Sequence, residues 1–164
     1  MPEEYIDQMT DSITESEAES SEKKYLTFVL GSEEYGIDIN DVKEIVGIQK
    51  ITNVPDMPPF VKGVINLRGK IIPVMDIRIR FSMSDRDYND RTCIIVVTIE
   101  DKEIGLIVDN VSEVLDIPIK DIENAESVSG KNEKYINGYG KVADSVKILL
   151  DIQSLLVGEQ LEQI

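Results

Sequence analysis

The sequence contains no histidine and only one cysteine among its 164 residues. Without histidine, neither a Ser-His-Asp nor a Cys-His arrangement nor a histidine metal site can form. One cysteine cannot build a zinc cage of thiolates or a disulfide within the chain. That residue, Cys93, lies in an apolar run, where we interpret it as a small buried hydrophobic side chain. No carboxylate pair or phosphate-binding loop stands out either, so the sequence predicts a protein that is not an enzyme and binds no metal or cofactor.

Long hydrophobic runs and concentrated positive charge are also missing. The longest apolar stretches, such as residues 93–97, are far too short to cross a bilayer, and no basic, apolar leader begins the chain. The formal net charge is −15. Nucleic acids and anionic membranes both require concentrated positive charge on the proteins that bind them. We therefore expect a cytoplasmic protein with no nucleic-acid partner and no direct insertion into a membrane.

The negative charge is distributed unevenly along the chain. Residues 1–22 hold eight acidic residues and no basic one, which leaves 24 of the 32 acidic residues to face all 17 basic ones in the rest of the chain. This first segment also has few large apolar residues and no lasting periodicity. We expect residues 1–23 to form a disordered, solvated acidic tail that is dispensable for folding, with a regulatory arm as the alternative.

Short runs rich in Val, Ile, Tyr and Thr begin at Lys24 and are separated by Gly, Asp and Asn. The predicted strands cover residues 25–30, 34–39, 63–68, 70–76, 93–100, 103–109, 137–142 and 145–151. Several short strands joined by tight turns indicate an all-β protein. Residues 76–81 and 151–164 are typical of short helices, because each begins with an aspartate that can cap the first turn.

The chain also contains an internal repeat. Residues 35–48 align without gaps on 104–117, a shift of 69, and residues 62–77 align on 137–152, a shift of 75. The order of the segments is the same in both halves, which predicts two copies of one β unit. Each copy is too small for a core of its own, so the two copies should pack face to face. We expect the C-terminal helix to pack through three apolar residues, Ile152, Leu155 and Leu156.

One residue of the first copy has no counterpart in the second. Arg68 lies at a glycine turn between two predicted strands, and the aligned position in the second copy is Ala143. Arginine at such a place has two interpretations. It can orient the strands through an ion pair, for which Glu44 is the candidate partner, or it can anchor a binding partner, since arginine is enriched at interface hot spots. The sequence leaves both open.

Three motifs together carry a resemblance to a known family. They are EEYGIDI at residues 33–39, GVINLRGKIIPV at 63–74 and EIGLIVDNVSEVLDI at 103–117. The chain resembles the CheW family of chemotaxis coupling proteins over residues 24–157. The resemblance implies two five-stranded SH3-like β-barrels packed on a shared hydrophobic seam, with a C-terminal helix. The first barrel is expected mainly over 35–83 and the second mainly over 92–150, with ends that can cross over, and residues 158–164 are expected to end the helix.

The resemblance also implies a function without catalysis. CheW-like proteins are scaffolds that bridge the cytoplasmic tips of methyl-accepting chemotaxis receptors to the histidine kinase CheA, supporting array assembly and kinase control. A protein of this kind is expected to be a monomer when isolated and to be recruited to membrane-associated receptor arrays. The alternatives are a coupling module for a diverged receptor-kinase pathway and a small-ligand sensor that uses the groove between the barrels.

Site residues carry over from the family by motif. The expected receptor-binding residues are Val42, Glu44, Gly63, Arg68, Val111 and Val114. The valines also suit core positions, and the glycine also suits a turn. The regulatory domain of CheA is expected to contact the segment 118–128, with Ile122 and Val128 as candidate residues.

Overall fold

Strands make up most of the computed structural model, which describes residues 21–125 and 133–156. The strands are β1 (Glu22–Leu30), β2 (Glu33–Asp38), β3 (Val42–Gly47), β4 (Val61–Leu67), β5 (Lys70–Asp76), β6 (Cys93–Ile99), β7 (Lys102–Val108), β8 (Asn110–Pro118), β9 (Ile122–Asn124), β10 (Ile136–Val142) and β11 (Ser145–Leu150). The helices are all short: the 3-10 turns η1 (Ile39–Asp41), η2 (Ile119–Asp121) and η4 (Glu133–Tyr135), and the α-helices α2 (Ile77–Arg80) and α3 (Ile152–Leu156).

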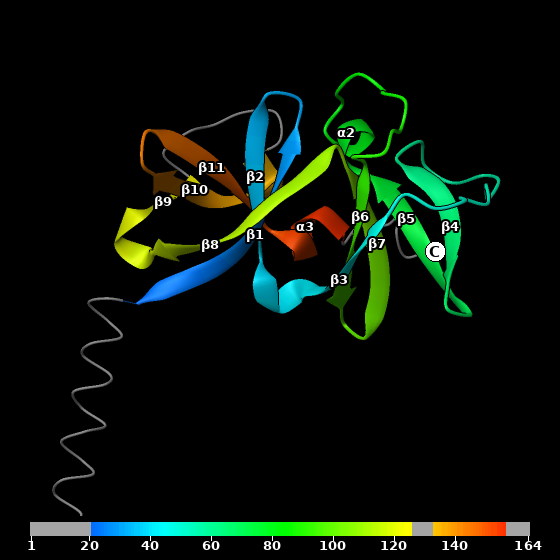
Figure 1. Cartoon of the computed structure of the whole chain (residues 1–164), viewed down its shortest axis with the longest axis horizontal. Coiled ribbons are helices and arrows are strands. Elements are labelled where there is room, and N and C mark those ends of the chain that lie inside the picture. Colours follow the sequence, from blue (N-terminus) through cyan, green and yellow to red (C-terminus); the bar gives the residue numbers. More distant parts are fainter. Residues whose placement is uncertain (1–20, 126–132, 157–164) are drawn as a thin grey trace, which may run out of the picture.

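The strands form two sheets that lie side by side, with α3 between them (Figure 1). The six-stranded sheet has the order β8-β1-β2-β11-β10-β9, and the five-stranded sheet has the order β3-β6-β7-β5-β4. Neighbouring strands are antiparallel except for the pairs β2·β11 and β5·β7, which are parallel. The predicted all-β fold with short helices is confirmed. The sixth strand, β9, has a counterpart in the other sheet that is reduced to one bridge between Thr52 and Val64.

Each sheet combines strands from both repeats. The segments 35–48 and 104–117 occupy equivalent positions, as predicted, because β2 and β7 each lie between an antiparallel and a parallel neighbour. Both segments then cross to the other sheet, where β3 and β8 form edge strands. The hairpin β1-β2 therefore completes the sheet of the second repeat, and β6-β7 completes that of the first. The sheets therefore do not follow the ranges 35–83 and 92–150, because β6 and β7 lie in the same sheet as β3, β4 and β5.

The largest core lies in the seam between the sheets. It contains Phe28 from one sheet and Ile95 from the other, both fully buried. The predicted contacts of α3 are confirmed, since its three apolar side chains, Ile152, Leu155 and Leu156, are all buried in this core. Burial of aliphatic side chains on this scale contributes about 1.5–3 kcal/mol for each one. The two sheets are therefore held together as one hydrophobic unit.

Arg80 lies where the two repeats meet. Its guanidinium carbon is 4.3 Å from the centre of the Phe60 ring and 4.9 Å from that of Tyr135, two residues related by the shift of 75. One Nη atom donates to the carbonyl oxygen of Leu155 at 3.3 Å. Stacking of a guanidinium between two rings is favourable when water is excluded, so this cation adds to the apolar contacts of the seam.

The predicted tail, residues 1–23, overlaps the first strand of the structure. Glu22 and Lys23 belong to β1 and pair with Pro118 and Ile117 of β8, because hydrogen bonding to an existing strand extends the sheet beyond the point where apolar residues end. Residues 1–20 lie outside the described part of the chain, as do residues 158–164.

Candidate functional site

Arg68 and Glu44 meet across an open side of the five-stranded sheet. Glu44 lies in β3, at one edge of the sheet order, and Arg68 lies in the turn that leads from β4, at the other edge, into β5. An Nη atom of Arg68 donates to a carboxylate oxygen of Glu44 at 2.5 Å. The pair therefore joins the two edges of the sheet, which confirms the ion pair proposed from the sequence.

The turn that carries Arg68 does not require an arginine. Arg68 has a φ of 53°, and its counterpart Ala143 has a φ of 52°. The Gly69 N–H closes the turn by donating to the side chain of Asn66 at 2.8 Å. Since the second repeat forms the same backbone with a methyl side chain, the arginine is a chemical addition to the turn. Its side chain is 69% exposed, and the bond to Glu44 uses only one of its five N–H donors.

Two lysines extend the charged group around this pair. Glu103, at the start of β7, accepts a hydrogen bond from Lys43 of β3 through one carboxylate oxygen and lies 2.9 Å from the Nζ of Lys70 of β5 through the other. Hydrogen bonds from Lys43 and then Lys70 lower the pKa of Glu103. We call these two lysines, together with Glu44, Arg68 and Glu103, the rim cluster. It gathers three cations and two carboxylates at one end of the five-stranded sheet.

The three valines of the expected receptor site differ in their surroundings. Val42 and Val111 are partly buried and pack against the main core, so both support the fold. Val114 is 49% exposed on β8, at the edge of the other sheet. Among the interactions described, none joins Val111 or Val114 to Arg68 or Glu44. The structure brings the charged pair together and places the two β8 valines at the equivalent edge of the other sheet.

Gly63 allows a close approach between two backbone segments and is not needed as a binding surface. It adopts a φ of 144°, and a Cβ at this position would lie 2.0 Å from the carbonyl oxygen of Thr52. Its counterpart Gly138 also allows a close backbone approach, since a Cβ there would lie 2.7 Å from the carbonyl oxygen of Glu123. Both glycines allow a neighbouring segment to cross β4 or β10 closely, because only glycine lacks the atom that would collide.

The expected kinase segment lies at the far end of the six-stranded sheet. Ile122 is in β9 and lines a pocket of about 220 Å³ together with Tyr25, the exposed Ile119 and Leu149. The pocket lies beside the start of β1, where the Ile119 N–H donates to the carbonyl oxygen of Ser21 at 3.0 Å. Val128 lies outside the described residues.

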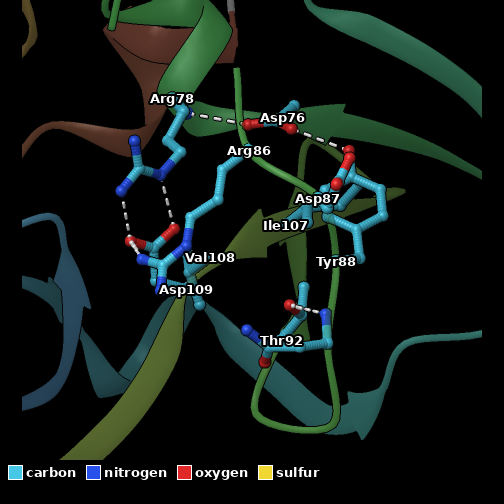
Figure 2. A pocket seen from close by; sticks show the side chains of 10 residues that line it. Asp76, Arg78, Arg86, Asp87, Tyr88, Thr92, Ile107, Val108 and Asp109 are labelled. Carbon is cyan, nitrogen blue, oxygen red and sulfur yellow. Dashed lines mark hydrogen bonds and ion pairs between the residues drawn. The ribbon is translucent and has the colours of Figure 1, made fainter. Parts of the chain in front are cut away.

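A polar network at the crossing between the sheets was not found from the sequence (Figure 2). Asp109 lies between β7 of one sheet and β8 of the other. Its carboxylate accepts two hydrogen bonds from Arg78, at 2.6 and 2.7 Å, one from Arg86 at 3.0 Å and one from the Gly31 N–H at 2.9 Å. These partners come from α2, from the loop after it and from the β1-β2 turn. Asp109 therefore fastens three segments at a point where the chain changes sheets.

Asp76 continues the network one turn away. It caps α2 by accepting from the Arg78 N–H at 2.9 Å, as predicted for this aspartate, and it also accepts from the Tyr88 hydroxyl at 2.7 Å. Burial and then this hydrogen bond raise the pKa of Tyr88. The cavity among these side chains holds only about 10 Å³, too little for a ligand. We interpret the network as structural. Its only sequence signal was the polar stretch 84–91, where Arg86 and Tyr88 lie.

Groups of side chains suited to a metal ion were sought in the part of the chain that the structure describes. Nowhere in residues 21–125 and 133–156 do three or more His, Cys, Asp or Glu side chains gather so as to hold a metal ion. No helix in these ranges is long and apolar enough to cross a membrane.

Two sheets with exchanged hairpins, a shared seam and an arginine-carboxylate pair at one edge define a duplicated β scaffold. The family model for the CheW-like domain matches residues 24–160, and the chain belongs to this family. It is 36% identical over 151 residues to the chemotaxis protein CheW of Klebsiella aerogenes, covering 92% of this chain and 91% of that protein. It is 33% identical to CheW of Treponema pallidum, covering 85% of each chain.

A solved structure has the same fold. The crystal structure of the scaffolding protein TtCheW from Thermoanaerobacter tengcongensis matches with a TM-score of 0.79 and 39% sequence identity. The match covers 85% of this chain and 95% of that one. The resemblance found in the three motifs is therefore confirmed over most of the chain.

Proposed function

We propose that this chain is a non-catalytic chemotaxis scaffold that bridges the cytoplasmic tips of chemoreceptors to the regulatory domain of the histidine kinase CheA. Membership of the CheW-like family supports this function, as do relatives named chemotaxis protein CheW and a related structure described as a scaffolding protein. In this function the protein works in the cytoplasm, as a monomer when isolated, and joins receptor arrays at the membrane.

The observation that carries the proposal is the exposed pair of Arg68 and Glu44. It joins two edges of a sheet, and the second repeat forms the same turn without an arginine. A receptor tip is a helical hairpin, and such a helix can place apolar side chains on a groove while charges at the rim fix its register. We assign receptor binding to Glu44 and Arg68, with the exposed Val114 as a further contact.

We assign kinase binding to the six-stranded sheet. The pocket beside Ile122 is apolar on one side, through Ile119 and Leu149, and lies in the six-stranded sheet, whereas the rim cluster lies in the five-stranded sheet. Two faces on one rigid core allow both partners to bind at once. Coupling then requires only that the scaffold hold receptor and kinase together, with no covalent change.

A three-component binding experiment tests this function. A soluble receptor-tip hairpin and the CheA regulatory domain, both from the same organism, are mixed with and without the chain, and complexes are separated by size-exclusion chromatography. We expect a complex of all three proteins only when the chain is present. Ile122→Glu should remove the kinase domain and retain the receptor fragment. Competition between the two partners for the chain would contradict a bridge.

A further inference from the structure

The rim cluster presents its cations to solvent and keeps its carboxylates beneath them. The side chains of Lys43, Lys70 and Arg68 are 48%, 60% and 69% exposed, whereas those of Glu103 and Glu44 are 8% and 25% exposed. The chain as a whole carries a net charge of −15. Within the rim cluster the solvent-exposed groups are therefore the cations, although the β6-β7 turn beside it adds the exposed Glu100 and Asp101.

The internal repeat provides a comparison within the same molecule. The counterparts of the three cations are Ser112, Ala143 and Ser145, all uncharged. The counterparts of the two carboxylates are both glutamates, Glu113 and Glu34. The second repeat therefore keeps the acidic groups and lacks cations at these three positions, although its Glu34 pairs with Lys147, whose counterpart in the first repeat is Ile72. The fold of the unit does not require cations at the three aligned positions.

Exposed apolar residues are retained in both repeats. Ile45 in β3 is 43% exposed and its counterpart Val114 is 49% exposed; Ile71 in β5 is 62% exposed and its counterpart Val146 is 51% exposed. Ile45 comes two positions after Lys43 and therefore lies on the same face of β3. Ile71 comes directly after Lys70 in β5 and points to the opposite face. Both sheets thus offer aliphatic side chains to a partner. In the six-stranded sheet Lys141 lies opposite Val146 and pairs with Glu123, whereas the five-stranded sheet adds an arginine and two lysines at the aligned positions.

We propose that Lys43 and Lys70 are binding residues and that, with Arg68, they select a partner helix that carries acidic side chains beside apolar ones. Glu103 lies beneath both lysines, with one carboxylate oxygen facing each ammonium group. Each lysine retains N–H donors beyond those that face Glu103, and charge complementarity at an interface rim raises the association rate and suppresses unsuitable partners. This inference rests on the proposed function, in which the helix belongs to the receptor tip.

Binding of the receptor-tip hairpin to the full chain tests the role of the lysines. The double variant K43S/K70S introduces the residue type found at both counterpart positions. We expect its dissociation constant to rise roughly 5–50-fold at low salt, as for the loss of two charged rim contacts, and the loss of affinity on adding salt to become smaller. The matched control is K24S/K141S, which removes two lysines of the other sheet that are 55% and 53% exposed and each face one carboxylate.

The variant Glu103→Gln distinguishes lysines that touch the partner from lysines that act only through Glu103. If the lysines touch the partner, this variant leaves them in place with one negative charge fewer nearby, and binding should be unchanged or tighter. If the lysines act only by neutralising Glu103, the same change made in K43S/K70S should restore the binding that the loss of the lysines removed, whereas lysines that touch the partner cannot be replaced in this way. Binding of the CheA regulatory domain, unchanged in K43S/K70S and Glu103→Gln, checks that these proteins are folded.

The outcomes separate this inference from the function on which it rests. Equal binding by K43S/K70S and K24S/K141S, with a clear loss for Arg68→Ala, would overturn the role of the lysines and leave the receptor site in place. Full restoration of binding when Glu103→Gln is added to K43S/K70S would also overturn it. If the unchanged chain fails to bind the receptor fragment, both the proposed function and this inference are wrong.

Discussion

Replacing Arg68 by alanine should weaken receptor binding and leave the fold intact. The side chain is 69% exposed and its partner Glu44 is 25% exposed. Exposed ion pairs of this kind contribute about 0.2–1 kcal/mol to stability, because water screens the charges and two long side chains must be ordered. The counterpart Ala143 already adopts the same φ, 52° against 53°. We therefore expect the free energy of unfolding to fall by less than about 1 kcal/mol.

The expected effect on binding is larger. An arginine that contacts a partner at an interface is worth roughly 1–3 kcal/mol when truncated, which corresponds to roughly a 5–150-fold rise in the dissociation constant. Arg68→Glu should weaken binding more, because it places a second carboxylate beside Glu44 and repels acidic groups of the receptor. Both variants should bind the CheA regulatory domain normally.

Two measurements show whether Arg68 binds the receptor or only stabilises the fold. Isothermal titration with the receptor-tip hairpin gives the dissociation constants, and urea unfolding gives the stability of each variant. Lys141→Ala is the control, since Lys141 pairs with Glu123 at 3.1 Å with a comparable exposure of 53% but lies in the other sheet. The site assignment is refuted if Arg68→Ala unfolds the chain or weakens receptor and kinase binding equally.

Three further results are expected. Deleting residues 1–20 should leave the urea midpoint and kinase binding nearly unchanged, because so acidic a segment has little apolar surface to offset the entropy of ordering; a large drop in either would show that it is part of the working structure. Burial alone would raise the pKa of Asp109, but hydrogen bonds from Arg78 and the Gly31 N–H, with the charges of Arg78 and Arg86, bring a net lowering. Its contribution to stability is therefore present above the unfolded-state pKa and lost as pH falls below about 5, so Asp109→Asn should cost about 2–4 kcal/mol at pH 7 and less at pH 3; a loss independent of pH would contradict this. Gly63→Ala should destabilise the chain by roughly 2–5 kcal/mol through the clash with Thr52, and a melting temperature equal to that of the unchanged chain would disprove the close approach.

The polar network around Asp109 shows why some important residues escaped sequence interpretation. Asp109 and Arg78 are 31 positions apart, and the Gly31 amide is 78 positions from Asp109. Charged residues at such separations have many possible partners, and only the folded chain selects among them. The cap of α2 by Asp76 was predictable because both groups lie within one turn, whereas the bond from Tyr88 to the same carboxylate depends on the path of a loop.

The sequence by itself determined the local structure and the repeat. Alternation of apolar residues and turn signals located eight of the eleven strands described and missed β3, β8 and β9. Aspartates marked the two α-helices, and the shifts of 69 and 75 related the halves. The ion pair between Arg68 and Glu44 could be proposed from the sequence, because the missing counterpart in the second repeat drew attention to the arginine. Only the tertiary structure decided that the hairpins β1-β2 and β6-β7 are exchanged between the sheets. The same hairpin patterns can complete either sheet, and the choice depends on where short connections direct the chain and on which seam buries more apolar surface.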